Sequence, residues 1–347
     1  MAENENKIDA VFEGGGVKGI GLVGAVSEIE AKGYEFVNLA GTSAGAIVAT
    51  LLAAGYKAAE VKDIINGLDF NTLVDPPLVG RIPIVGPVVT EISRMGLYKG
   101  DVFLQLMRKL LHERGIHTFR DLILPEYAEE ERYRYKVRVI ASDISRGRLV
   151  VLPQDAKEYG MEPDDLEVAL AVRMSMSIPF FFEPIKLKDC VIVDGGVLSN
   201  FPVQLFDSPG PPEWPTFGFK LTLDDLENPR QMTKVKYRVA GPISGLIALF
   251  FTAMEASDAY YLKTHNFVRT IAINTLEVKS TDFNLSSKQK EALYQSGVEA
   301  AQNFLKQWNF KEYVDLYRSG KPVPQRREQV LPRTLALSAP EGVIRSS

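Results

Sequence analysis

A serine stands between two glycines where a predicted strand leads into a predicted helix. Gly41-Thr42-Ser43-Ala44-Gly45 fits the pattern G-x-S-x-G, in which a tight turn exposes a serine hydroxyl above a sheet. A side chain at either glycine would collide with the neighbouring strand or helix as the turn tightens. The helix that follows adds positive potential near a developing negative charge. We therefore predict that Ser43 is a nucleophile in a strand-to-helix elbow.

A run of three glycines follows an earlier predicted strand. Gly14, Gly15 and Gly16 have no side chains, so their backbone N–H groups can point into a cavity, as an oxyanion hole requires. Together with Gly19 the run also matches G-x-G-x-x-G, the turn that binds dinucleotides. That alternative requires an acidic residue at the end of the second strand, where this chain has Ser43 and its neighbours. The oxyanion hole is the favoured interpretation, and cofactor binding would test the alternative.

A nucleophilic serine needs a general base, and histidine is the usual one. The three histidines, His112, His117 and His265, lie among charged or polar residues, a setting typical of surface positions. Asp194 instead ends a predicted buried strand and precedes two glycines that would let another backbone come close. Burial in a cleft would also make its carboxylate a stronger base. We predict that Asp194 accepts the proton of Ser43.

The predicted elements place all three turns at the ends of strands. Strands alternating with helices predict an α/β fold, a three-layer α/β/α sandwich with a mostly parallel central sheet, whose ligand sites lie at the carboxyl ends of its strands. Strands are predicted at 10–12, 36–40, 135–141, 149–152, 191–193 and 268–273, with a further apolar run at 214–223. Helices are predicted at 17–32, 46–54, 100–112, 166–174, 241–261 and 286–308, the last capped by Ser286.

We expect one catalytic domain over residues 1–318. Prolines and glycines interrupt the apolar sequence at about 68–98, so this segment cannot continue a helix or a central strand. We expect it to form an irregular cap. Its residues 78–89 and the later residues 243–251 are the candidates for membrane contact. Residues 319–347 are rich in Ser, Pro and Arg, which predicts a flexible tail.

The bulk composition narrows the classes of function. The net charge of −4 provides no basic field to attract a phosphate backbone, so nucleic acid is not an expected partner. Cys190 is the only cysteine, which excludes an intrachain disulfide and a Cys-rich metal site. The polar N-terminus lacks the pattern of a secretory signal. We expect a cytoplasmic protein that contacts membranes peripherally and uses no metal or cofactor.

The order of these motifs resembles that of the patatin-like phospholipases. Glu13 to Gly19 is similar to the family's glycine-rich block, the Ser43 turn to its elbow, and Asp194-Gly195-Gly196 to its base motif. A segment similar to the family's S-x-S-x-P motif and a similar closing region extend the resemblance to about residues 8–305. Small departures are Lys18, where arginine is frequent, and Glu13, where aspartate is frequent.

The resemblance implies a lipid acyl hydrolase with a Ser-Asp dyad instead of a triad. Ser43 would be the nucleophile, Asp194 the base, and Gly15 and Gly16 donors to the oxyanion, with no metal. The S-x-S-x-P serines, Ser175 and Ser177, are expected to form a turn and act structurally. A catalytically silent protein that only contacts membranes is the remaining alternative, and labelling by a fluorophosphonate would distinguish it from an enzyme.

Overall fold

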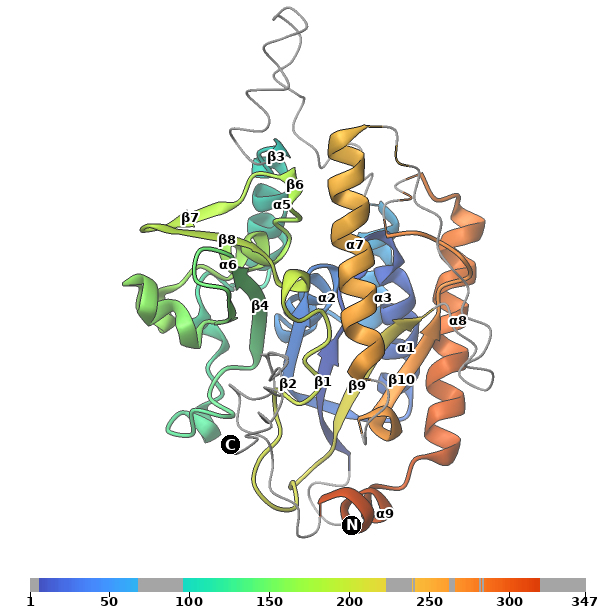
Figure 1. Ribbon diagram of the computed structural model, residues 1–347. Helices are drawn as coiled ribbons and strands as arrows, with labels where there is room; N and C mark the ends of the chain where they lie inside the picture. Colours follow the sequence, from blue (N-terminus) through green and yellow to red (C-terminus); the bar gives the residue numbers. More distant parts are fainter. Residues whose placement is uncertain are drawn as a thin grey trace, which may run out of the picture.

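The computed structural model describes residues 6–67, 96–222, 239, 241–261, 266–280, 282 and 284–318 (Figure 1). Its main sheet has the strand order β10-β9-β1-β2-β4-β8-β7, and β5 also pairs with β4. The strands are β1 (Lys7–Phe12), β2 (Glu35–Thr42), β4 (Val137–Asp143), β5 (Arg148–Leu152), β7 (Ile185–Leu187), β8 (Cys190–Asp194), β9 (Thr216–Thr222) and β10 (Thr270–Asn274). A second, small sheet pairs β3 (Gly96–Tyr98) with β6 (Phe180–Phe182).

The helices follow the strands along the chain. They are α1 (Gly19–Ala31), α2 (Ala44–Ala53), α3 (Ala58–Gly67), α5 (Asp101–His112), α6 (Val168–Ser175), α7 (Pro242–Tyr261), α8 (Ser287–Gln307) and α9 (Phe310–Tyr313). Short 3-10 turns include η1 (Gly16–Lys18) and η7 (Gly195–Val197). From β10 to β4 neighbouring strands run parallel, which confirms the predicted α/β fold with a mostly parallel sheet.

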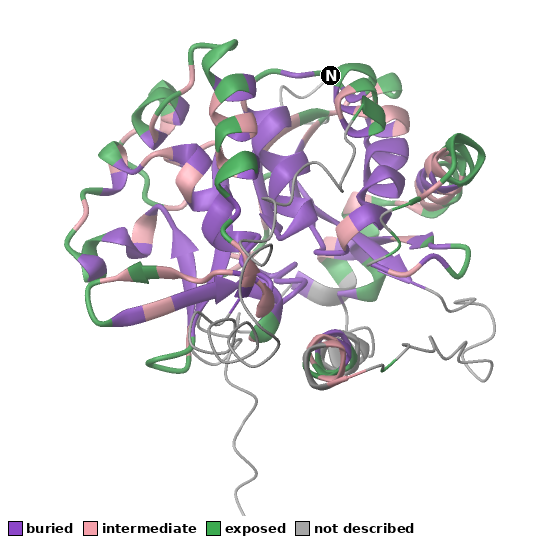
Figure 2. Ribbon diagram, turned by 90° about the horizontal axis from the view of Figure 1, so that it is seen from above, coloured by how far each residue is buried: buried purple, intermediate pink, exposed green. Residues whose placement is uncertain are grey.

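The alternation of side chains along β1 shows how the sheet is buried on both faces. Ile8, Ala10 and Phe12 pack into the large core formed with α1, α2 and α8. Val11 points to the opposite face, where it packs against Phe206 from the irregular chain before β9. Figure 2 shows these strands as an almost continuously buried layer, with the exposed residues on the outer helices and loops. The central strands are therefore buried on both faces, as expected for a covered parallel sheet.

Most predicted elements occur within a few residues of their expected ends. Ser286 caps α8 by accepting a hydrogen bond from the Gln289 N–H, as predicted. The predicted strand at 191–193 is β8, but it runs antiparallel to β4. Several elements were not predicted: the helices α3 and α9, the strands β6 and β7, and the short strand β3 at the end of the expected cap at 68–98. The rest of that cap, and the predicted tail at 319–347, lie outside the described residues.

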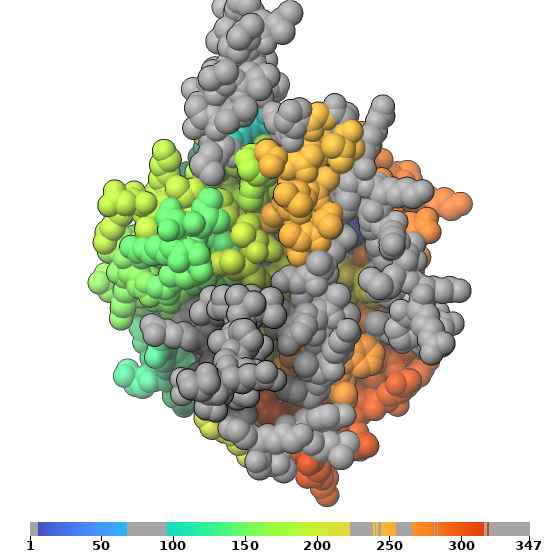
Figure 3. Space-filling view, in the orientation of Figure 1, coloured from blue at the N-terminus to red at the C-terminus, as the bar shows by residue number. Residues whose placement is uncertain are grey.

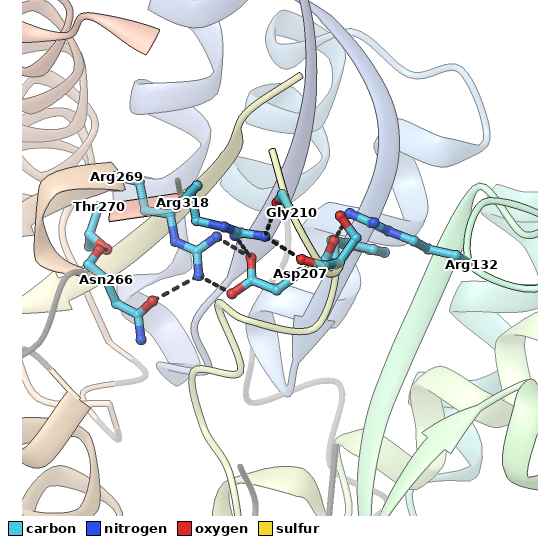
Figure 4. Close-up of polar contacts among 9 residues, drawn as sticks. Arg132, Asp207, Gly210, Asn266, Arg269, Thr270 and Arg318 are labelled. Carbon is cyan, nitrogen blue, oxygen red and sulfur yellow. Dashed lines mark hydrogen bonds and ion pairs between the residues drawn. The ribbon is translucent and has the colours of Figure 1, made fainter. Parts of the chain in front are cut away.

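A buried charge cluster ties the end of the described chain to the sheet. Asp207, in the chain before β9, accepts a hydrogen bond of 2.8 Å from Arg269 Nη2 and one of 2.9 Å from Arg318 Nη1. In Figure 4 the carboxylate faces both guanidinium groups, and Asn266 accepts a further bond of 2.7 Å from Arg269. Burial by itself would raise the pKa of Asp207, but attraction to the two arginines outweighs burial and lowers it.

Replacing Asp207 by asparagine is expected to destabilise the protein at pH 7 by about 3–5 kcal/mol, because it leaves two buried guanidinium groups without a counter-charge. The carboxylate contributes stability above its unfolded pKa of about 3.8, and this contribution is lost as the pH falls through its lower folded pKa. Urea unfolding at pH 7 measures the change. The control is Asp165→Asn, whose partner Arg120 is exposed, with an expected cost below about 1 kcal/mol. Equal costs for the two variants would contradict the prediction.

Candidate active site

Ser43 occupies the turn between β2 and α2 in a backbone conformation that side chains rarely adopt. Its φ is 54° and its ψ is −125°, and such strain in a residue other than glycine concentrates at functional sites. The turn is also sterically tight. A Cβ on Gly41 would lie 2.3 Å from the carbonyl carbon of Gly45, and one on Gly45 would lie 2.4 Å from the Phe12 carbonyl oxygen. The local sequence therefore builds the sharp strand-to-helix elbow that its glycine spacing predicted.

The register of three strands brings Asp194 to the same place. β2 ends with Thr42 opposite Ile140 of β4, and β8, running the other way, ends with Asp194 opposite the next residue, Ala141. Both strands must share one edge of β4, because β5 pairs along the whole of residues 139–143 and occupies the other edge. The ends of β2 and β8 therefore point toward each other. Ser43 and Asp194, distant in sequence, meet over one step of β4.

The Asp194 carboxyl is buried, and its environment changes its acidity. Only 1% of the residue is exposed. Burial raises the pKa of this carboxyl to about 7, against the lowering effects of the Gly196 N–H and of the Ser43 side chain. Oδ1 accepts the Gly196 N–H at 2.8 Å. A carboxyl with this pKa accepts a proton near neutral pH far better than an ordinary aspartate does.

The serine hydroxyl donates to a sulfur atom in this arrangement. Ser43 lies near enough to lower the pKa of Asp194, yet its Oγ donates to Met176 Sδ at 3.6 Å. Oδ2 of Asp194 makes no hydrogen bond with any described residue. The rotation that would aim the hydroxyl at Asp194 therefore exchanges a weak sulfur acceptor for an unsatisfied carboxylate oxygen.

The glycine loop after β1 lies against the elbow. A Cβ on Gly14 would be 3.0 Å from Ser43 Cβ, which places the loop directly beside the nucleophile. The Gly14 N–H donates to the Asn200 carbonyl at 3.3 Å, whereas the N–H groups of Gly15 and Gly16 donate to no described residue. Gly16 has a φ of +58° and packs on the Ser280 carbonyl. Of the three predicted oxyanion donors, Gly15 and Gly16 thus have N–H groups available, and Gly14 uses its own in the loop.

The S-x-S-x-P serines support the two turns from within the protein. Ser175 Oγ accepts the Ser43 N–H at 2.8 Å and donates to the Ile140 carbonyl at 2.6 Å. The Ser177 carbonyl accepts the Asp194 N–H at 2.9 Å. The structural role predicted for this pair therefore has a definite form, because one serine anchors the elbow and the other anchors the end of β8. Sequence spacing alone did not reveal that both contact the candidate site.

The described histidines lie elsewhere. His112 and His117 are exposed and face each other with their ring centroids 4.1 Å apart, while His265 lies outside the described residues. The prediction that His112 and His117 are surface residues is confirmed. Over the part of the chain described here, no group of three or more His, Cys, Asp or Glu side chains is arranged to hold a metal ion.

Helix α7 packs against the turn that follows Asp194. Met254 lies 2.8 Å from the position that a Cβ on Gly196 would take, and Phe251 packs with Ile178 in a buried apolar cluster. The opposite side of the helix is open to solvent, with Leu249 64% exposed. In Figure 3 this helix forms part of the molecular surface. None of the helices in the described part is both long and apolar enough to cross a membrane.

Of the two segments predicted to contact a membrane, one lies in α7. Residues 243–251 lie in α7, and their described members include both the exposed Leu249 and the buried Phe251. The other candidate, residues 78–89, lies outside the described residues. A dinucleotide site would need an acidic residue at the end of β2 to bind the ribose. β2 ends instead at Thr42 and leads directly into Ser43.

Known proteins resemble this chain in sequence and in fold. A family model described as patatin-like phospholipase matches residues 10–207. The uncharacterized protein YqhO of Bacillus subtilis (strain 168) is 40% identical over 308 residues, which cover 87% of this chain and 99% of the relative. The probable lipid hydrolase 463L of Invertebrate iridescent virus 6 is 26% identical over 56% of this chain and 61% of its own length.

A solved structure shares the fold at low sequence identity. The crystal structure of VipD from Legionella pneumophila superimposes with a TM-score of 0.53 and 19% identity, covering 87% of this chain and 67% of that chain. At this level of identity the likeness concerns the arrangement of strands and helices alone.

Proposed function

Because this chain belongs to the patatin-like phospholipase family, we propose that it is a lipid acyl hydrolase in which Ser43 is the nucleophile and Asp194 the general base. The observation that carries the proposal is the meeting of β2 and β8 on one edge of β4, next to the glycine loop. It gathers a strained serine, a buried carboxyl of raised pKa and available backbone N–H groups. These are the parts that acyl transfer to serine needs.

The first half of the proposed reaction acylates the serine. The Ser43 oxygen attacks the ester carbonyl carbon while the hydroxyl proton passes to Asp194. The carbonyl oxygen becomes an oxyanion, which the N–H groups of Gly15 and Gly16 stabilise. When this intermediate collapses, the bond to the alcohol oxygen breaks and Asp194 returns the proton to that oxygen. The products are an acyl-serine and a free alcohol, such as a lysolipid.

The second half restores the enzyme. Water attacks the acyl-serine carbonyl while Asp194 accepts one of its protons, and the same N–H groups stabilise the second oxyanion. Collapse breaks the bond to Ser43, which takes the proton back from Asp194, and a fatty acid is released. One ester and one water thus give one alcohol and one acid, and the protein needs no cofactor for any step.

The side chains around the pair favour an apolar acyl group. Met176 touches the Ser43 hydroxyl, and Met254, Phe251 and Ile178 pack above the end of β8. Such a lining accepts a hydrocarbon chain at little desolvation cost. Met254 and Phe251 belong to α7, and the exposed Leu249 on the outer side of that helix supports peripheral contact with a membrane. We propose a cytoplasmic enzyme that takes its substrate from a membrane surface.

Incubation with a total lipid extract tests this function directly. The expected result is the release of free fatty acid, together with the matching lysolipid or alcohol, measured by mass spectrometry against the same extract with Ser43→Ala protein. The identity of the alcohol product then defines the lipid class. Equal fatty acid release by the parent and by Ser43→Ala would reject the proposal.

The pH dependence of activity is expected to follow Asp194. Because only its carboxylate can accept the serine proton, kcat/KM on a soluble ester should fall about tenfold per pH unit below a pKa of about 7. The measurement is kcat/KM of a short-chain p-nitrophenyl ester between pH 5 and 9, with unfolding monitored at each pH. An acidic limb centred near pH 4, the ordinary value for aspartate, would contradict the raised pKa of Asp194, and the loss of that limb in Asp194→Asn tests whether Asp194 is the base.

A further inference from the structure

Asn200 holds the glycine loop by both of its polar groups. Its backbone carbonyl accepts the Gly14 N–H at 3.3 Å, and its side-chain Nδ2 donates to the Gly14 carbonyl at 3.1 Å. Asn200 is 2% exposed, so these bonds lie away from competing water. One residue therefore fixes the peptide planes on both sides of the Gly14 Cα.

The second of these bonds determines where an oxyanion donor points. The Gly14 carbonyl and the Gly15 N–H belong to one planar trans peptide, in which they point in opposite directions. Holding the carbonyl toward Asn200 therefore directs the Gly15 N–H away from Asn200. Glycine backbones rotate easily, so this Gly-Gly peptide would otherwise be able to turn over and present its oxygen in place of its N–H.

The orientation of the Asn200 amide is itself held by charge. Glu13 Oε1 lies 3.4 Å from Asn200 Nδ2 and 2.5 Å from Lys220 Nζ. An acceptor at this position favours the rotamer that turns the NH₂ group toward Glu13 and the Gly14 carbonyl. The buried ion pair of Glu13 with Lys220 keeps that acceptor charged and in place. Glu13, which departs from the family's frequent aspartate, thus supports the loop through Asn200.

The chain around Asn200 also joins the loop to the other two parts of the site. The preceding residue, Ser199, accepts the Thr42 hydroxyl at 3.2 Å with its carbonyl. Its own N–H donates to the Gly195 carbonyl at 2.9 Å. This short segment therefore touches the elbow, the turn after Asp194 and the glycine loop at once.

We propose that Asn200 is a positioning residue that orients the Gly14–Gly15 peptide so that the Gly15 N–H can stabilise the oxyanion. This inference rests on the proposed acyl transfer at Ser43 and goes beyond it by assigning the group that builds the oxyanion hole. Asn200 acts through the peptide and does not itself touch the reacting atoms. Its loss should therefore affect the transition state more than the binding of substrate.

The test compares Asn200→Leu and Asn200→Ala with a matched buried asparagine. Leucine keeps the branched shape of asparagine but donates no hydrogen bond, and alanine serves as the second variant in case leucine prevents folding. The control is Asn38→Leu, because Asn38 is fully buried and its Nδ2 donates to two backbone carbonyls, those of Tyr133 and Tyr135, at 3.1 and 3.0 Å. Thermal unfolding of every variant is recorded beside its kinetics.

For both Asn200 variants we expect kcat on a soluble ester to fall by about 10- to 100-fold, with KM changed by less than about threefold. Asn38→Leu should lower the unfolding temperature but keep kcat within about twofold. A second readout uses an alkyl trifluoromethyl ketone, whose carbonyl carbon bonds to Ser43 Oγ and whose oxygen becomes an anion. Fluorine NMR should show the pKa of that adduct oxygen raised by about one unit or more in the Asn200 variants.

The outcomes separate this inference from the function on which it rests. If the parent neither hydrolyses the ester nor forms the ketone adduct, the acyl transfer itself is wrong and the inference falls with it. If the parent is active but the Asn200 variants keep its kcat and its adduct pKa, the positioning role alone is overturned. A fall in kcat that Asn38→Leu reproduces at equal destabilisation would also overturn it, since it would reflect general loss of structure.

Discussion

Ser43→Ala is expected to lower kcat on lipid and soluble esters by about 10⁴-fold or more, because the acyl-serine can no longer form and only binding and the oxyanion donors remain. A fluorophosphonate probe should label the parent on the peptide that contains Ser43, as peptide mass spectrometry would show, and should leave Ser43→Ala unlabelled. The fold should survive, since alanine removes only a hydroxyl that donates a weak hydrogen bond to the Met176 sulfur. Circular dichroism and the unfolding temperature check this point.

A serine at a distance from the site provides the control for that experiment. Ser296 is half-buried on α8, and its hydroxyl donates to the Asn274 carbonyl at the end of β10. Ser296→Ala should be labelled at the parent's rate and keep its kcat. Labelling of the parent at another serine, or full activity of Ser43→Ala, would refute the assignment of the nucleophile. A parent that is neither labelled nor active would favour the membrane-contact alternative.

Asp194→Asn is expected to abolish activity and, at alkaline pH, to stabilise the fold. Activity should fall by about 10³-fold or more, because the amide has the size of the carboxylate but cannot accept the serine proton. The second effect follows from the raised pKa. The folded state holds this proton up to pH of about 7, whereas the unfolded chain releases it near 3.8. Above pH 7 the parent therefore carries a buried charge at a cost on the order of a few kcal/mol.

The sign of that effect distinguishes Asp194 from other buried aspartates. The contribution of Asp194 to the unfolding free energy is fully present below a pH of about 4, and it is lost as the pH rises to about 7. The gain in unfolding free energy of Asp194→Asn over the parent should therefore be small at pH 5 and large at pH 8. Asp207→Asn should instead lower the unfolding free energy by a similar amount at pH 5 and at pH 8, because both values lie above the unfolded pKa of about 3.8 and above the lower folded pKa of that carboxyl. Urea unfolding of the three proteins at both pH values measures this, and a destabilised Asp194→Asn at pH 8 would contradict the buried, unpaired carboxylate.

Lost activity in Ser43→Ala and Asp194→Asn, together with the greater stability of Asp194→Asn at pH 8, would identify a site whose residues favour catalysis at the expense of stability. A buried carboxylate with one unpaired oxygen is a cost that evolution can remove with a single amide substitution. A strained serine beside it is a second such cost. Both costs lie at the same step of β4, which is the pattern expected where function and not folding selects the residues.

The parts of the site that sequence could predict are those whose geometry is local. Gly41 and Gly45 flank Ser43 because the turn itself leaves no room for side chains, so their spacing already indicates an elbow. The same holds for the capping of α8 by Ser286. The short strand β3 was missed because its partner, β6, is remote in sequence. The amphipathic helix α3 was also missed, because the predicted helix ended at residue 54 and no element was predicted between it and the cap.

Tertiary structure decided every contact that depends on which segments of the chain lie side by side. The sequence by itself determined three sharp turns at strand ends, an apolar sheet and a carboxylate in need of a partner, because steric limits and periodicity act over a few residues. It did not determine that β8 reverses direction and faces β2 across one edge of β4, nor that Ser175 and Asn200 hold the elbow and the glycine loop. Those contacts join residues more than a hundred positions apart. Only the packing of the folded chain specifies them.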